Sequence, residues 1–422
     1  MQELSLKPSE KNISQIAVIM FAFAIILRFA IGVLYYNSND TLWYRDWAVS
    51  LPDGFFNVYA RRDVIGLDYP PVYLFLLYIT GLCYRIVGIN AHNYMQMFLL
   101  KFWPIVTDVL CAFVLYKIFG KYQKTVGLIV SFMWLFNPSV IFNCAFWGQT
   151  DGLMCLLLFV SFYALLTEKP LLACCLFAVA GLTKYQCLFF TPVFLSELFI
   201  RFKFKKSFKG IIVAALTVAV VFIPFMIGSK DPFLFFNLYL GGQNKYPHCT
   251  LNAFNIYGVF LLNWIPDAEI ILFGKISLNT LSNILTVLIV IGSVLISVFA
   301  KRKSMWITSF LLMSTLFMFT TRMHERYLFP VLVFLLAAAF LHKNKKFAII
   351  FVLYSLTTFL NQIIPMMSWN TEGSAIIEYY TFLLMIMSVL GFGVYLYSTA
   401  VSLDFLFDLK LFENNTAKGE VR

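Results

Sequence analysis

The chain has 422 residues, of which 61% are hydrophobic and 13% charged, and its formal net charge is +11. About a quarter of the residues of a soluble protein are charged, so this composition excludes a soluble globular domain and indicates an integral membrane protein. The Lys and Arg residues stand in short clusters between apolar runs. That is the pattern of cytoplasmic loops and not of a nucleic-acid-binding surface.

The apolar runs predict an all-α, polytopic transmembrane bundle of about 12–14 helices, because roughly 20 apolar residues cross a bilayer. The first run is long enough to span and lacks a small-residue cleavage site, so we expect a membrane anchor and not a cleaved signal peptide. The candidate helices lie near residues 13–36, 71–88, 95–118, 125–143, 150–167, 170–183, 186–200, 210–228, 279–300, 304–321, 327–341, 346–363 and 376–398.

Basic clusters at 201–206, 301–303 and 343–346 predict cytoplasmic loops. Working outward from them places both ends of the chain in the cytoplasm, which requires an even number of crossings. One candidate between 71 and 149 is therefore expected to be broken, re-entrant or split, and the Asn137-Pro138 step is the favoured break.

Two non-cytoplasmic segments, 37–69 and 229–277, are unusually long for loops of a compact protein, and such loops are usually functional. The first mixes carboxylates, including Asp46, with Arg and aromatic residues, which suits short helices lying in the membrane interface. We expect residues 1–422 to form a single integral membrane domain that carries both loops.

Several carboxylates and amides stand where an outer loop meets a helix. Asp40 directly follows the first predicted helix, where burial favours a basic carboxylate. Asp68 precedes the double proline that opens the second helix, and Gln149 and Asp151 stand at a later helix start. Each residue also fits a simple role as a helix cap or a partner of the helix dipole, and local features do not decide between the two roles.

Cations occur on the same predicted side of the membrane, against the positive-inside trend. Lys184 lies between two apolar runs at the outer surface, where a lipid phosphate is a natural partner. Arg322, His324, Glu325 and Arg326 lie within five positions, and ionisable residues at membrane depth are candidates for function. A plain interfacial cluster of snorkelling side chains is the alternative.

A carboxylate and a set of cations at one membrane surface suit glycosyl transfer from a lipid-linked sugar. The carboxylate would take the proton of an acceptor hydroxyl, and the cations would stabilise the departing lipid phosphate. The eight cysteines are scattered without a CxxC pair or a metal-ligand spacing. We therefore expect no metal site, no cofactor and no disulfide.

The stretch from Asp40 to Trp47 and the motif Gly66-Leu-Asp-Tyr-Pro-Pro71 resemble the GT-C superfamily of membrane glycosyltransferases. They are similar to the dolichyl-phosphate-glucose glucosyltransferases and to bacterial relatives of the GPI mannosyltransferases. Residues 146–152 and 323–330 look like later motifs of the bacterial branch. The resemblance implies that Asp40 is the catalytic base of an inverting, metal-independent hexosyltransferase.

On this resemblance the partners are a polyprenyl-phosphate-linked sugar donor, membrane lipid, and a glycan, glycolipid or protein acceptor. Arg322, His324, Arg326 and Lys184 would bind the donor phosphate, while Asp46, Asp68, Gln149, Asp151 and Glu325 would contact substrate. The composition favours a bacterial plasma membrane with the site on its outer face, and the luminal face of the endoplasmic reticulum is the alternative.

Two other classes of function stay open at this point. A transporter or flippase would move a lipid-linked sugar without making a bond, although we find no internal repeat of the kind common in transporters. A non-catalytic assembly protein would not need the acid and base groups.

Overall fold

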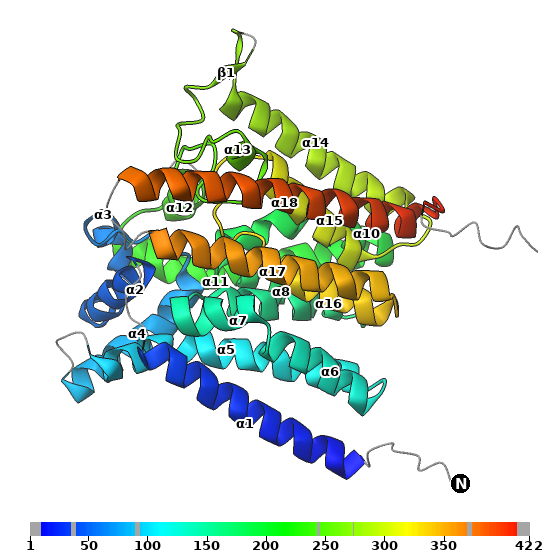
Figure 1. The fold of residues 1–422 in the computed structure, drawn as a ribbon. Coiled ribbons are helices and arrows are strands. Elements are labelled where there is room, and N and C mark those ends of the chain that lie inside the picture. The colour runs from blue at the N-terminus through cyan, green and yellow to red at the C-terminus, as the bar shows by residue number, and fades with distance from the viewer. Residues whose placement is uncertain are drawn as a thin grey trace, which may run out of the picture. The chain divides into compact units, whose positions relative to one another are not determined.

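The computed structural model describes residues 10–34, 39–88, 93–242, 245–272, 274–368 and 374–411 (Figure 1). Two compact units make up the chain. The first unit comprises Met1–Cys187 and Phe208–Gly242, and the second comprises Leu188–Ser207 and Gln243–Arg422. The described part is helical apart from one two-stranded hairpin and a few isolated bridges.

The first unit holds the amino-terminal helices and most of α11. Its elements are α1 (Glu10–Leu34), α2 (Asn39–Ser50), η1 (Leu51–Asp53), η2 (Val58–Arg61), α3 (Arg62–Ile65), α4 (Pro71–Val87), α5 (Tyr94–Gly120), α6 (Lys124–Leu135), α7 (Pro138–Ile141), η3 (Phe142–Trp147), α8 (Asp151–Leu166), α9 (Pro170–Gly181), α11 (Phe204–Ser229) and α12 (Leu234–Gly241).

The second unit holds the remaining helices and the hairpin, and the short η4 (Tyr185–Phe190) joins it to the first unit. Its elements are α10 (Thr191–Arg201), α13 (Ile256–Val259), β1 (Ile271–Leu272), β2 (Ile276–Ser277), α14 (Leu278–Phe299), α15 (Met305–Phe319), α16 (Val331–Leu341), α17 (Lys345–Ser368) and α18 (Ser374–Phe407). The two strands are antiparallel, with Ile271 opposite Ser277.

Each apolar run of the sequence coincides with a helix. Within the described ranges, six helices are long and apolar enough to cross a membrane, one bent pair is a further candidate, and five apolar helices are shorter. The expected polytopic all-α bundle is confirmed, with differences at helix ends. The last helix continues to Phe407 instead of ending near 398, and α16 begins at Val331 instead of 327 because the residues before it form an irregular segment.

The expected break at Asn137-Pro138 is confirmed. Helix α6 ends at Leu135, the chain resumes as a helix at Pro138, and the two pieces are bent by 54°. Proline has no backbone N–H and cannot continue the helix, while the Asn137 side chain accepts from the N–H of Ser139 at 2.9 Å and starts the new piece. Beyond α7 the turn widens to the π-helix Phe142–Trp147.

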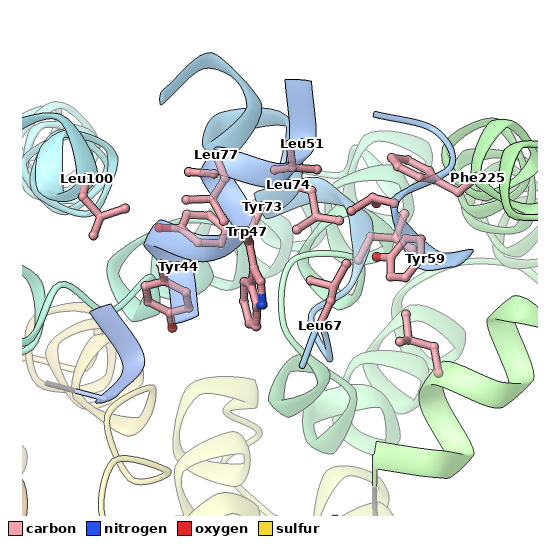
Figure 2. Packing of buried hydrophobic residues seen from close by; sticks show 14 of the residues in the cluster. Tyr44, Trp47, Leu51, Tyr59, Leu67, Tyr73, Leu74, Leu77, Leu100 and Phe225 are labelled. Carbon is pink, nitrogen blue, oxygen red and sulfur yellow. The ribbon is translucent and has the colours of Figure 1, made fainter. Parts of the chain in front are cut away.

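Aromatic and leucine side chains form a buried core cluster of the first unit (Figure 2). Helix α2 contributes Tyr44 and Trp47, α4 contributes Tyr73, and α11 contributes Phe225, all buried. The expected short helices of the first outer loop are therefore present, and they pack on the bundle through these rings. Their place in the membrane interface stays a prediction.

Helices of the second unit differ in what they bury. The segment Val331–Ala339 of α16 is buried on all sides, as its uniformly apolar sequence requires, whereas α14 exposes Ile284, Val287 and Ile291 along one face. An exposed apolar face on a long apolar helix is the surface that a membrane protein presents to lipid tails. The apolar stretch near 254–273 forms α13, turns and the start of the hairpin and does not form a membrane helix.

One glycine sets how closely two elements of the first unit approach. A Cβ added to Gly81 of α4 would lie 2.0 Å from the carbonyl oxygen of Ala48, whereas a Cβ at Gly292 of α14 would meet nothing within 4 Å. We predict that Gly81→Ala lowers stability by about 1–3 kcal/mol through overpacking. Thermal unfolding in detergent should show a lower Tm for Gly81→Ala and no loss for the control Gly292→Ala, and equal Tm values would contradict the close approach.

Candidate functional site

The carboxylate of Asp40 lies in the first turn of α2 and is held by two side chains from the broken helix. Its Oδ2 accepts a hydrogen bond from Trp147 Nε1 at 3.0 Å and another from Gln149 Nε2. Trp147 ends the π-helix, and Gly148 follows with φ +80°, a conformation that favours glycine. The broken span thus delivers two donors to the carboxylate that sequence reasoning assigned as the base.

Gln149 connects Asp40 to a pair of tyrosines. Its Oε1 accepts from Tyr44 OH at 3.0 Å, and the Tyr44 hydroxyl shares a 2.6 Å hydrogen bond with Tyr69 OH. Because the amide donates to the carboxylate through Nε2 and accepts through Oε1, its orientation is set from both ends. Local sequence features had shown only that Gln149 stands at a helix start.

Lys184 and Asp151 form a buried ion pair beside this network, with side chains only 3% and 2% exposed. Lys184 Nζ also donates to Gln149 Oε1 at 3.3 Å, and Asp151 Oδ2 accepts from Asn143 Nδ2 at 2.9 Å. The outer cation that lacked a partner in the sequence thus has a carboxylate counter-ion. Its assignment as a phosphate ligand stays a prediction, and the geometry gives it a role in positioning Gln149.

The other two predicted carboxylates of the first unit lie at its edge. Asp46 pairs with Arg45 at 2.6 Å and is about half exposed. Asp68 contributes its backbone carbonyl, which accepts from Tyr185 OH, and it stands just before the proline that opens α4. The structure therefore brings Asp40, Gln149, Asp151 and Lys184 into one network, and substrate contacts of Asp46 and Asp68 stay predictions.

Arg322, His324, Glu325 and Arg326 lie together in the irregular segment between α15 and α16 of the second unit. Arg322 has φ +65° and makes a bidentate pair with the fully buried Asp267, at 2.8 and 3.3 Å. Thr321 Oγ1 also donates to Asp267 at 3.0 Å. A backbone conformation that costs energy is held here by a strong ion pair, as is common at functional sites.

Glu325 organises the two remaining cations of this segment. It is buried, its Oε1 accepts from Arg326 at 2.7 Å, and His324 Nδ1 lies 3.9 Å from its Oε2. Burial opposes ionisation of Glu325, but the nearby His324 and Arg326 outweigh it and lower the pKa of Glu325. The His324 ring packs against Tyr246 and Tyr327.

Sequence reasoning missed three functional candidates. Trp147 lies in the stretch 146–152, which the sequence analysis singled out for Gln149 and Asp151, so the motif itself could have identified it. Tyr44 reads as an ordinary core residue, and Asp267 is 55 positions from its partner Arg322, so no local pattern connects them. In the described ranges no group of three or more His, Cys, Asp or Glu is arranged to hold a metal, and the metal-free expectation stays a prediction.

The network around Asp40 belongs to the first unit, and the cluster around Arg322 belongs to the second. The expectation that Asp40 and these cations serve one reaction stays a prediction.

Comparisons with known proteins agree with a polytopic membrane fold. Residues 56–264 match the family described as GPI transamidase subunit PIG-U, which is slightly less than half of the chain. A search of curated proteins finds no match. Among solved structures, ArnT from Cupriavidus metallidurans bound to undecaprenyl phosphate is similar, with a TM-score of 0.51 and 11% identity over 92% of this chain and 76% of that chain.

At 11% identity the likeness to ArnT shows the fold alone. With the helices described above it confirms the fold class, a polytopic all-α membrane bundle. The finer relationships expected from the sequence motifs, to glucosyltransferases or to GPI mannosyltransferases, are not decided by these matches.

The buried pair of Lys184 and Asp151 generates a stability prediction. Lys184→Met leaves Asp151 as an uncompensated buried charge, so we expect a loss of about 3–5 kcal/mol. The double variant with Asp151→Leu removes both charges and should recover most of the Tm. The control Lys124→Met breaks an exposed pair with Glu10 and should change stability little; an equally small loss for Lys184→Met would contradict a structural ion pair.

Glu325 generates a pH prediction. Its pKa is lowered on folding, so its contribution to stability is fully present above the unfolded value of about 4.3 and is lost as the pH falls through the lower folded value. We expect the Tm of the wild type to fall in this acidic range and the dependence to flatten in Glu325→Gln. Asp408→Asn, which breaks the exposed pair with Arg302, is the control and should keep the wild-type profile.

Proposed function

We propose that the protein is a membrane glycosyltransferase that moves a hexose from a polyprenyl-phosphate sugar to a hydroxyl of an acceptor. The observation that carries the proposal is the Asp40 carboxylate, oriented by Trp147 and Gln149 and half buried at the start of α2. A general base must be held within reach of the proton that it takes, and two fixed donors provide this orientation.

The chemistry is a single displacement with inversion. Asp40 takes the proton of the acceptor hydroxyl while the oxygen of that hydroxyl forms a bond to the anomeric carbon of the sugar. The bond from that carbon to the phosphate oxygen breaks, and its electron pair leaves with the polyprenyl phosphate. The negative charge that grows on the phosphate is stabilised by Arg322, His324 and Arg326.

The acidic residues have separate roles in this proposal. Asp267 and Glu325 hold the cations in place, as their ion pairs with Arg322 and Arg326 indicate. Asp46 and Asp68, at the edge of the first unit, would accept hydrogen bonds from sugar hydroxyls. Asp151 and Lys184 keep Gln149 on Asp40.

The nature of the donor is supported by the fold. The similar structure of ArnT is described as bound to undecaprenyl phosphate, a polyprenyl phosphate of the class that the sequence resemblance implies. We place the reaction on the outer face of a bacterial plasma membrane, since the basic loops predict a cytoplasmic location for the opposite side. The acceptor is a glycan, glycolipid or protein.

A second candidate is a non-catalytic subunit of a membrane complex. The match of residues 56–264 to a family described as a GPI transamidase subunit favours it. In that case Asp40 and its donors would serve packing or partner binding, and sugar transfer by the purified chain would be absent.

We predict that Asp40→Asn abolishes transfer, with a loss of about 10³-fold or more, because the amide cannot act as the base. The measurement is the release of polyprenyl phosphate and labelled product in proteoliposomes supplied with polyprenyl-phosphate hexoses. The control is Asp63→Asn, which changes a 96% exposed carboxylate of the same outer segment and should keep the wild-type rate.

Three outcomes contradict the proposal in different ways. Full activity of Asp40→Asn removes Asp40 from the mechanism. Movement of labelled donor across the bilayer without transfer by the wild type supports a transporter. The third outcome is a cellular function that is lost when the protein is deleted and fully restored by the Asp40→Asn variant. It supports the subunit role.

A further inference from the structure

Charged side chains from α1 and α5 surround the broken helix of the first unit. Arg28 comes from α1, and Lys101 and Asp108 come from α5. All three are buried. They lie on helices long and apolar enough to cross a membrane. The mechanism above does not use any of them, although charges at membrane depth are costly and are expected to have a role.

Arg28 and Asp108 join three helices at the end of α6. Arg28 Nε donates to Asp108 Oδ2 at 2.8 Å, and its NH2 group donates to the carbonyl of Leu135 at 2.8 Å. Asp108 Oδ1 accepts from Trp134 Nε1, also at 2.8 Å. The last turn of α6 is thus held through both its backbone and a side chain.

The backbone break explains why a guanidinium is useful at this point. Helix α6 ends just before Pro138, so carbonyls of its last turn lose their usual partners. A carbonyl left unsatisfied away from water costs energy, and Arg28 reaches the carbonyl of Leu135. Asp108 neutralises the charge of the Arg28 guanidinium in this buried position.

Lys101 holds the other end of the broken segment. Its Nζ donates to the carbonyls of Ala145 and Phe146 at 3.0 and 2.7 Å, directly before Trp147. A Cβ added to Gly148 would lie 3.3 Å from Lys101 Cγ and 3.3 Å from the methyl carbon of Thr41, the neighbour of Asp40. The lysine therefore packs against the chain between the two donors of the Asp40 carboxylate.

We propose that Arg28, Asp108 and Lys101 are positioning residues for the transfer reaction. They fix the two ends of the segment from Leu135 to Phe146, and this segment carries Trp147 and Gln149 to Asp40. The inference rests on the proposed function for its kinetic consequences. The pinning of the segment itself does not depend on that function.

If the ion pair of Arg28 and Asp108 only stabilised the fold, its replacement would change the Tm and leave kcat unchanged. A positioning role predicts a loss of kcat. Replacing both partners of a buried pair by apolar residues is often neutral or stabilising. The double variant Arg28→Met, Asp108→Leu removes both charges but also the partners of the Leu135 carbonyl and of Trp134 Nε1, so we expect it to fold with a moderately lowered Tm. Its kcat should fall by about 10²-fold, since a misplacement of about 1 Å costs that much, while KM for the donor should stay within about twofold.

Trp134→Phe tests the Leu135 end of the segment, and Lys101→Met tests the Phe146 end. Trp134→Phe keeps a buried aromatic ring, so it also serves if the larger changes prevent folding. Each should lower kcat more than it changes KM. The matched control is Glu10→Gln, since Glu10 pairs with Lys124 at 2.6 Å and so also joins α1 to α6, but in an exposed position. Wild-type kcat in the double variant or in Lys101→Met would overturn the proposal.

Hydrogen exchange of the backbone amides separates this inference from the proposed function. In Trp134→Phe and Lys101→Met, amides of residues 139–149 should exchange faster than in Glu10→Gln, with those of α8 unchanged. If the wild type transfers no sugar but this exchange pattern is found, the pinning stands and the proposed reaction fails. Unchanged exchange in both variants would overturn the pinning whatever the activity.

Discussion

A missing backbone donor at Pro138 is the constraint on which the architecture around Asp40 depends. In a bilayer every backbone polar group needs a partner within the protein, and a proline after α6 removes one of the regular donors. The carbonyl of Trp134 accepts from the Asn137 N–H instead. The Ser139 N–H turns to the Asn137 side chain, so the carbonyl of Leu135 is served by Arg28. At the far end of the broken segment, Lys101 serves the carbonyls of Ala145 and Phe146. The same bend of 54° brings Trp147 to the Asp40 carboxylate. The break at Asn137-Pro138 and the buried charges at its two ends thus belong to the same arrangement that orients Asp40.

Much of the fold was predictable because hydropathy averages over about 20 residues and tolerates local exceptions. The break before Pro138 was also predictable, since it follows from the chemistry of one residue. Helix ends were less so: α18 runs to Phe407 because nothing in its sequence forbids helix there, and α16 starts late because residues 320–330 form turns and a bridge. These turns depend on contacts with the distant residues 251 and 252, which no window of sequence contains.

The site shows the same division between local and distant information. Asp40 and Gln149 were identified from motifs, but their hydrogen bond links positions 109 apart in the sequence. For Lys184 the sequence does not show the partner of the side chain. A lysine at the outer surface suggests a phosphate ligand, whereas the structure pairs it with the buried carboxylate of Asp151. Asp267 could not be found at all, because a carboxylate after a proline in a long loop has no distinguishing pattern until Arg322 is placed next to it.

The pairing of Arg28 with Asp108 also has a consequence for how the chain enters the membrane. The two residues are 80 positions apart, and ribosomes add about 5–20 residues per second, so α1 emerges roughly 4–16 seconds before its counter-ion. During that interval a guanidinium in an apolar helix has only lipid headgroups, water or the insertion machinery as partners. Stable insertion of α1 is therefore coupled to the arrival of α5. The counter-ion of Arg28 becomes available only when α5, the next long apolar helix after α1, reaches the bilayer.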